Sequence, residues 1–207
     1  MAQKNFAMTV QEVTEVVTTL STIVVGGPQI TCIWLIFPNQ GDVFDILKDV
    51  MCGLVYLHSK DMIHMDIKPD NILVNSTWKR KTGRLWNFKL YCQLQGHELH
   101  LSPWQGTPLY RAPELLHRAA PTKAADMWSM GLTTLEVMTG VQPYKEVATY
   151  KGTKVPKELL DNTLPESLQT LLPVNRKILL MVLNFDPNKR MSAADWLLKL
   201  DGYQLTD

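Results

Sequence analysis

Hydrophobic residues recur at helical spacing in several segments of the chain. Residues 123–139 are apolar on most faces and end before Gly140, which predicts a helix buried in the middle of a domain. Two shorter helices are expected at residues 174–184 and 192–199. A further amphipathic helix is expected over residues 42–59, where one face carries Phe44, Leu47, Val50, Met51, Leu54 and Leu57.

The N-terminal part mixes helix and strand signals. In residues 9–25 the spacing of the valines favours a helix, although the many β-branched residues also allow a strand. Residues 30–37 form a short apolar run bounded by turn residues, which is typical of a buried strand. Residues 72–74 and 85–90 are two further strand candidates. The pattern as a whole predicts an α+β fold that is mainly α.

Composition and charge exclude several classes of protein. The chain has 207 residues, of which 45% are hydrophobic, and its formal net charge is +1, so it is globular and lacks the basic excess of a general nucleic-acid binder. The basic run at residues 79–84 is therefore interpreted as a solvated hairpin tip. Thr, Gly and Pro interrupt the apolar residues 13–37, which argues against a membrane span. We expect an intracellular protein, cytoplasmic or nuclear, with no nucleic-acid or membrane partner.

Cysteine and histidine spacing does not favour a metal centre. Cys32, Cys52 and Cys92 are odd in number and widely spaced, which indicates neither a disulfide framework nor a metal-binding pair and suits a reducing compartment. His97 and His100 lie three residues apart near Cys92, but no fourth ligand is evident. The sequence therefore predicts no metal site of this kind.

The chemistry-bearing residues occur in four short motifs. Residues 64–71 read HMDIKPDN, Gly106 and Thr107 follow, residues 112–114 read APE, and residues 126–131 read DMWSMG. Their order and spacing resemble the eukaryotic-type protein kinase family, in its serine/threonine branch. The motifs correspond to the catalytic loop, the end of the activation segment and the buried central helix.

The resemblance covers about residues 30–200 and is specific for the C-lobe of that family. It implies a protein-kinase-like C-lobe over residues 30–207. Residues 1–29 would then be a vestigial N-terminal segment, which could form a helix. These are too few residues for an ATP-binding lobe, so we expect the chain to be truncated relative to the family.

The resemblance also implies roles for residues of the catalytic loop. Phosphoryl transfer needs a carboxylate that orients the attacking hydroxyl, metals that bridge the phosphates and cations that offset developing charge. Asp66 would be the catalytic base, Lys68 would contact the transferred phosphate, and Asn71 would hold a metal. The alternative for Asp66 and Asn71 is a structural role, in which they cap a tight loop with side-chain hydrogen bonds.

Four further residues are expected to be structural. His64 and Asp126 resemble the scaffold pair of the family, in which the buried carboxylate binds the backbone of the catalytic loop. Glu114 and Arg190 would form the ion pair that holds the activation segment on the helical floor. Their presence predicts that the C-lobe fold is retained.

The nucleotide side departs from the family pattern. No Gly-rich loop precedes residue 30, and no Lys or Arg occurs from Asn5 to Leu47, so Lys4 is the only earlier cation. Cys92 stands at the place of the metal-binding Asp, and no Asp occurs between Asn71 and Asp126. Only Glu98 offers a carboxylate nearby, and a thiol is a poor ligand for Mg²⁺.

The residue before Asp66 departs as well. Met65 replaces the Arg that receives activation-loop phosphates, so phosphorylation of Ser102 would have no charged receiver. The sequence thus predicts a truncated, catalytically impaired pseudokinase that binds or regulates another protein, with a kinase as the expected partner. Its architecture is similar to that of truncated, virus-encoded kinase-like inhibitors.

Two alternatives stay open from the sequence. The first is an active serine/threonine kinase that uses Asp66 and Lys68 with ATP and Mg²⁺ as cofactors; the leading interpretation needs no cofactor. The second is a decayed or alternatively spliced product of a full kinase, without a function of its own.

Overall fold

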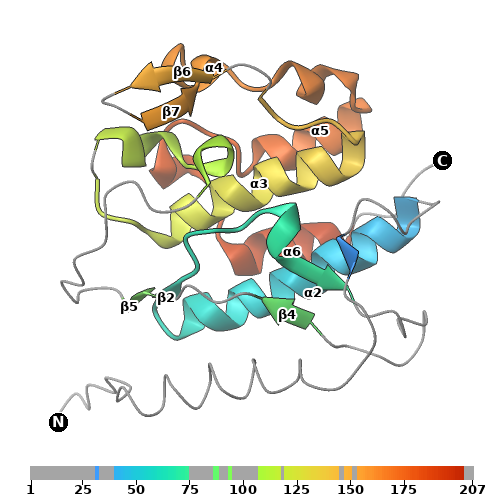
Figure 1. Ribbon diagram of the computed structural model, residues 1–207. Helices are drawn as coiled ribbons and strands as arrows, with labels where there is room; N and C mark the ends of the chain where they lie inside the picture. Colours follow the sequence, from blue (N-terminus) through green and yellow to red (C-terminus); the bar gives the residue numbers. More distant parts are fainter. Residues whose placement is uncertain are drawn as a thin grey trace, which may run out of the picture.

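The described part of the computed structural model is mainly helical and contains three small antiparallel sheets (Figure 1). This confirms the predicted α+β, mainly α fold. The predicted helix at residues 9–25 and the predicted boundary between residues 29 and 30 lie outside the described residues. The described residues are 31–32, 40–74, 86–88, 93–94, 107–117, 119–144, 147–150 and 153–202.

Helix α2 spans Gln40–Ser59 and begins two residues before the predicted segment. Its apolar face is buried where it is described, because five side chains at the predicted spacing are at most 2% exposed: Leu47, Val50, Met51, Leu54 and Leu57. This face packs on α6 (Ala193–Asp201) and on α3 (Lys123–Thr139). The amphipathic pattern therefore joins an early helix to the last one.

Helix α3 is the centre of the core, as its all-round apolar pattern predicted. Every residue from Ala125 to Glu136 is buried, and Figure 1 shows the helix crossing the middle of the fold. It ends at Gly140, which adopts φ 68 and donates its N–H to the Glu136 carbonyl at 2.8 Å. Glycine adopts this left-handed backbone conformation without strain.

Gly131, inside α3, allows a close approach of the chain after α5. A Cβ atom on Gly131 would lie 2.8 Å from Leu183 Cδ2 and 2.9 Å from Val182 Cγ2, closer than ordinary carbon contacts. Leu183 and Val182 are themselves buried. The missing side chain at this position thus lets the two segments pack against each other.

The strands form short antiparallel pairs. One sheet has the order β1-β3-β4, from Thr31–Cys32, Ile72–Val74 and Trp86–Phe88. The strand predicted at residues 72–74 is confirmed; for 30–37 and 85–90 the described strand residues are 31–32 and 86–88. A second pair joins β2 (Met62–Ile63) to β5 (Gln93–Leu94), on either side of the catalytic-loop motif.

The hairpin of β6 (Val147–Tyr150) and β7 (Thr153–Pro156) was not predicted. Its sequence signal is a Lys-Gly pair between two short runs with β-branched residues. The short helix α4 (Lys157–Leu160) follows it directly. The described chain also contains 3₁₀ turns at Pro69–Asn71, Pro108–Tyr110, Pro113–His117, Glu166–Thr170 and Pro187–Lys189.

The two last helices differ in length from the prediction. Helix α5 spans Pro173–Leu180, so the prediction that it reaches residue 184 was wrong. The Met181 N–H bonds the Ile178 carbonyl at 3.3 Å, and Asn184 Oδ1 accepts from the Asp186 N–H at 2.9 Å, which turns the chain back. Helix α6 runs two residues further than predicted and is capped by Ser192, whose Oγ accepts from the Asp195 N–H.

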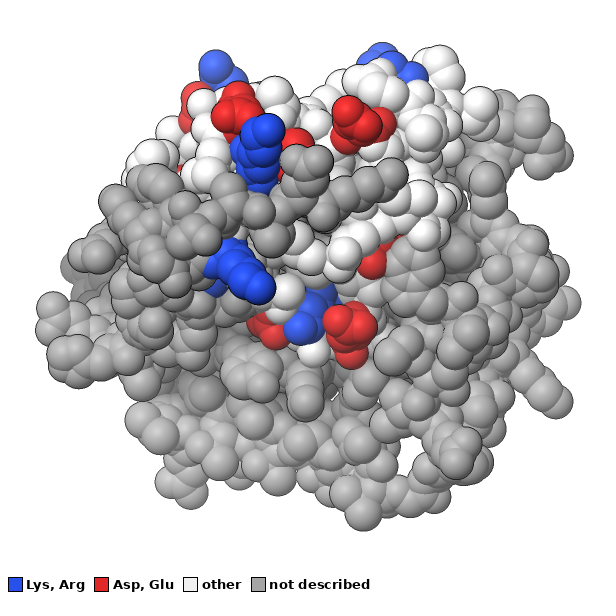
Figure 2. All heavy atoms as spheres, turned by 45° about the horizontal axis from the view of Figure 1, so that its top comes forward, with Lys and Arg blue, Asp and Glu red and all other residues white. Residues whose placement is uncertain are grey.

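Charged side chains are mixed in sign on the described surface. Figure 2 shows Lys and Arg interspersed with Asp and Glu over the coloured part of one face, without a large area of one sign. This distribution agrees with the formal net charge of +1. Among the described helices, none combines the length and the apolar character that crossing a bilayer requires.

The close contact at Gly131 can be tested by adding one methyl group. Alanine stabilises a helix interior by about 1 kcal/mol relative to glycine, but overpacking a core costs about 1–3 kcal/mol. We expect Gly131→Ala to lower the free energy of unfolding measured with urea. Gly202→Ala should change this free energy by no more than about 0.5 kcal/mol, because its Cβ would meet its nearest atoms only at 3.7 and 3.8 Å. A more stable Gly131→Ala variant would contradict the close packing.

Candidate active site

The Asp66 carboxylate lies in the loop between β2 and the turn at Pro69–Asn71 and accepts three side-chain or backbone donors. Its Oδ1 accepts from the backbone N–H of Thr107 at 3.0 Å and from the Thr107 hydroxyl at 2.9 Å. Its Oδ2 accepts from Asn71 Nδ2 at 2.8 Å, and the same amide donates to the Asp66 carbonyl at 2.6 Å. The loop therefore holds this carboxylate in one orientation.

Lys68 joins the same group through Thr107. Its ammonium donates to Thr107 Oγ1 at 2.8 Å and lies 4.0 Å from Asp66 Oδ2, at the outer limit of an ion pair. The side chains of Lys68 and Asp66 are only 20% and 18% exposed. Such a group can orient a hydroxyl with the carboxylate and offset negative charge with the lysine.

The structure thus brings together Asp66, Lys68 and Asn71, and adds Thr107 as the residue that connects them. The sequence analysis used Thr107 only as part of a motif and did not place it against Asp66. The two residues are 41 positions apart, so no local pattern could show the contact. We call Asp66, Lys68, Asn71 and Thr107 the loop cluster.

The Asp126 carboxylate holds the backbone of the loop from below. It is 1% exposed and lies in the first turn of α3, where a negative charge is favourable. Its Oδ2 accepts from the His64 N–H at 2.8 Å and its Oδ1 from the Met65 N–H at 2.9 Å. Met65 has φ 72, a conformation that costs a non-glycine residue about 1–3 kcal/mol. The two charge-assisted bonds offset this strain.

Asp126 has a third donor that the sequence analysis missed. His58 Nε2, at the end of α2, lies 2.9 Å from Asp126 Oδ2, so the imidazole N–H donates to the carboxylate. The expected pair of His64 and Asp126 is present through the backbone of His64. The ring Nδ1 of His64 instead accepts from the Asp66 N–H at 3.3 Å.

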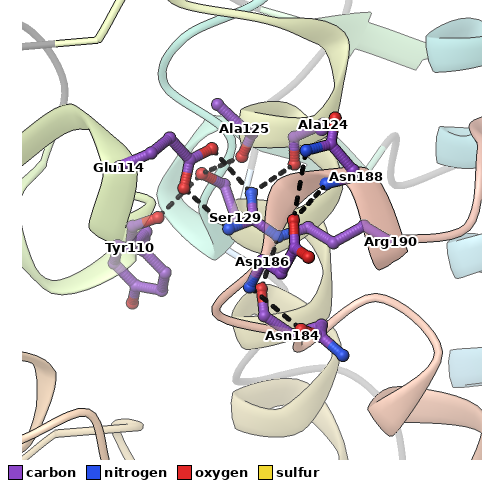
Figure 3. A network of polar contacts seen from close by, with 9 residues as sticks. All are labelled: Tyr110, Glu114, Ala124, Ala125, Ser129, Asn184, Asp186, Asn188 and Arg190. Atoms are coloured by element: carbon purple, nitrogen blue, oxygen red, sulfur yellow. Dashed lines mark hydrogen bonds and ion pairs between the residues drawn. The ribbon is translucent and has the colours of Figure 1, made fainter.

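Glu114 and Arg190 form a buried, bidentate ion pair (Figure 3). Arg190 Nη1 donates to Glu114 Oε1 at 2.7 Å and Nη2 donates to Oε2 at 2.6 Å. Arg190 also donates to the carbonyls of Asn184 and Ala124, at 2.7 and 2.9 Å. Its side chain is fully buried, with the guanidinium 5.1 Å from the ring centre of Trp128. One side chain therefore connects three separate segments.

A second buried polar contact near the loop was not predicted. The hydroxyl of Tyr110 donates to Glu136 Oε2, and both residues are at most 5% exposed. Burial raises the pKa of Glu136; the Tyr110 hydrogen bond opposes this shift and the charge of Asp70 adds to it. Burial, followed by the bond to Glu136, also raises the pKa of Tyr110. Ser129 Oγ donates to the Tyr110 carbonyl at 2.7 Å and holds the same segment on α3.

The described residues do not fit the paired magnesium site that the family uses. Asn71 donates with its amide nitrogen, which leaves its amide oxygen as the atom that a metal could contact. Within the described ranges, no group of three or more His, Cys, Asp and Glu side chains could hold a metal. Cys92, Glu98, His97 and His100 lie outside those ranges.

Removing Arg190 tests the central ion pair. Arg190→Ala would leave Glu114 in a largely buried position without its partner, which costs about 3–5 kcal/mol for such pairs. We expect a marked fall in the melting temperature, measured by circular dichroism. The control is Lys189→Ala, because Lys189 forms a mostly exposed pair with Asp186 at 3.6 Å and surface pairs contribute at most about 1 kcal/mol. Equal melting curves for Arg190→Ala and the unsubstituted chain would contradict the role of the pair.

Comparison with known proteins supplies the family. The model of the protein kinase domain matches residues 34–199. The serine/threonine-protein kinase pakA of Talaromyces marneffei is 31% identical over 83% of this chain and 26% of its own length. The serine/threonine-protein kinase sid1 of Schizosaccharomyces pombe is 34% identical over 77% of this chain and 33% of its own length.

A third relative is the calcium/calmodulin-dependent protein kinase kinase of Caenorhabditis elegans, 30% identical over 74% of this chain and 28% of its own length. The chain thus spans between about a quarter and a third of these curated relatives. The family match over residues 34–199 and the mainly helical fold confirm the protein-kinase-like C-lobe. The chain belongs to the eukaryotic serine/threonine protein kinase family.

Proposed function

We propose that this chain is a catalytically impaired protein-kinase-like module that binds and regulates another protein, with a protein kinase as the partner. The observation that carries the proposal is a mismatch inside one chain. The loop cluster and its buried supports have the geometry of a working site, whereas the metal-binding Asp of the family motif is replaced. Cys92 stands at the place of that Asp.

The metal argument supports the impaired state. Mg²⁺ requires oxygen ligands in near-octahedral geometry and is normally bound by carboxylates together with the phosphates. Between Asn71 and Asp126 the chain has no Asp, and the Asp126 carboxylate already accepts three hydrogen bonds at 2.8 to 2.9 Å. Of the two residues that hold the metals in the family motif, Asn71 alone is therefore retained. One neutral oxygen ligand is too weak for that role.

The retained supports favour a role in binding. Asp126 and Arg190 hold the loop and the segment at residues 107–117 through contacts within the chain. A surface whose backbone is held rigidly loses little entropy when a partner binds. The module can thus present a kinase-like surface even when it transfers no phosphate.

Exposed apolar side chains support contact with a protein. Helix α5 and the residue before it expose Leu172, Val174 and Leu180 to 55, 39 and 44%. On α6, Leu198 is 70% exposed. Apolar side chains at a surface favour association with another protein when they are gathered in one area.

Binding of ATP and Mg²⁺ tests the impaired state. A ligand at a hundred times its dissociation constant stabilises a protein by about 2.7 kcal/mol, or about 5–10 °C for a chain of this size. We expect the melting temperature to be unchanged by ATP with MgCl₂, compared with ATP and EDTA. A magnesium-dependent rise that is lost in Asn71→Ala, but kept in the surface variant Asn188→Ala, would contradict the proposal.

The loop cluster itself favours a second candidate function, an active serine/threonine kinase. Asp66 and Lys68 are held together through Thr107, with Thr107 Oγ1 2.9 Å from Asp66 Oδ1 and 2.8 Å from Lys68 Nζ, the geometry that this chemistry needs. Transfer of phosphate from ATP to a protein hydroxyl, abolished in Asp66→Asn, would establish this function in place of the first.

Retention on purified kinases tests the partner. We expect the immobilised chain to retain at least one kinase of a purified panel, because it would present a surface of the same family. The same experiment without residues 1–25 shows whether that segment contributes to binding. An unrelated helical protein of similar net charge serves as the control. If neither form retains any kinase above this control, the proposed partner class is wrong.

A further inference from the structure

A cavity of about 410 Å³ lies where the end of α2 meets the first turns of α3 and α6. Its volume is within the range of small-molecule sites, about 300–1,000 Å³. Much of its wall is apolar, from Val55 of α2, Met127 of α3 and Met191 and Ala193 at the start of α6. No part of the function proposed above uses this cavity.

The ionisable side chains among the described residues of its wall are all basic: His58, Lys123 and Arg190. His58 and Arg190 are committed to Asp126 and Glu114, as described above. Lys123 lies at the rim with its side chain 37% exposed, and its ammonium is 2.5 Å from the carboxylate of Asp61, which is itself 73% exposed. A solvated surface pair of this kind is weak, so Lys123 can also bind an anion.

Two helices begin in the wall of the cavity. Lys123 and Ala124 open the 17-residue helix α3, and Ala193 and Ala194 open the nine-residue helix α6. The first N–H groups of a helix have no partner within it, and its dipole is positive there. The side chain of Thr122 makes no capping bond to α3. The hydroxyl of Ser192 caps α6 by accepting from the Asp195 N–H and donates to Asp195 Oδ2 at 2.6 Å. The cavity therefore combines an apolar wall with the Lys123 ammonium at its rim and the first turns of two helices.

We propose that this cavity binds a small amphipathic carboxylate, with its aliphatic body against Val55 and Met127 and its carboxylate towards Lys123. The apolar wall would bury the body of such a ligand. A cationic ligand with the same aliphatic body would be repelled by Lys123. A neutral ligand of the same length would gain no electrostatic attraction from it. This site does not depend on whether the chain transfers phosphate.

The cavity is also placed to act on the candidate active site. His58 in its wall holds Asp126, which holds the backbone of His64 and Met65. Arg190 in its wall holds Glu114, at the start of the turn at Pro113–His117. A ligand that packs against His58 restricts a side chain on which the loop depends. The bound ligand thereby stabilises the loop at a distance.

Titration of the full chain with three ligands of equal chain length tests the site. The probes are octanoate, octanamide and octylammonium, followed by calorimetry. We expect octanoate to bind, octanamide to bind about tenfold more weakly, and octylammonium not to bind; decanoate should bind more tightly by about fourfold for each added methylene. Equal affinities for the three head groups, or no binding of octanoate, would overturn the proposal.

Two variants locate the site and one controls for charge. Ala193→Leu fills the cavity and should abolish binding of octanoate. Lys123→Gln, which leaves the core untouched, should weaken it about threefold to fivefold. The control Lys177→Gln removes an exposed lysine of α5 outside the cavity wall and should leave the affinity unchanged. Equal loss of affinity in Lys177→Gln and Lys123→Gln would overturn the location.

Hydrogen exchange tests the connection to the loop. We expect octanoate to slow the exchange of the His64 and Met65 amides more than it slows the exchange of the α5 amides. The same measurement on Ala193→Leu should show no effect of octanoate. If octanoate binds but the exchange rates of the His64 and Met65 amides do not change, the coupling to the loop is wrong and only the binding site stands.

Discussion

The Asp126 carboxylate is the constraint on which the candidate active site depends. It accepts hydrogen bonds from the backbone of His64 and Met65 and from the ring of His58, at 2.8 to 2.9 Å, while 1% exposed. A buried carboxylate without donors would be very costly. The Asp126 charge is therefore stable in the core only with its three donors. In turn, its bond to the Met65 N–H holds that residue at φ 72. Because Asp126 belongs to the most buried helix, the loop inherits the rigidity of the core.

Arg190 extends the same principle to the segment at residues 107–117. The guanidinium satisfies Glu114, two backbone carbonyls and the face of Trp128 with one fully buried side chain. Its partners lie up to 76 positions away in the chain. Buried ion pairs of this kind favour one arrangement of the chain over its alternatives more than they add net stability. The fold around the loop cluster is thus specified by two buried charges, Asp126 and Arg190, whose contacts hold the backbone in place.

Much of the helical fold could be predicted from the sequence. The apolar spacing in α2 and α3 showed both helices because each buries one face, or every face, against the core. Helix α5 was predicted too long, because the turn after Leu180 depends on the Asn184 side chain and on the space at Gly131, which periodicity does not record. The motif resemblance placed Asp66, Lys68 and Asn71 in one loop. It did not show Thr107 or His58 in contact with that region, because these contacts join residues 41 and 68 positions apart.

The sequence by itself determined the family and the residues that stand at its motif positions. Motifs are local, so the order of HMDIKPDN, APE and DMWSMG and the Cys at position 92 can be read without coordinates. The tertiary structure decided which donors fill the Asp126 carboxylate, which segments Arg190 joins, and that α2, α3 and α6 enclose an apolar cavity with a basic rim. These features depend on distances between elements far apart in the chain. Such distances are set by how buried faces pack, and no single segment contains them.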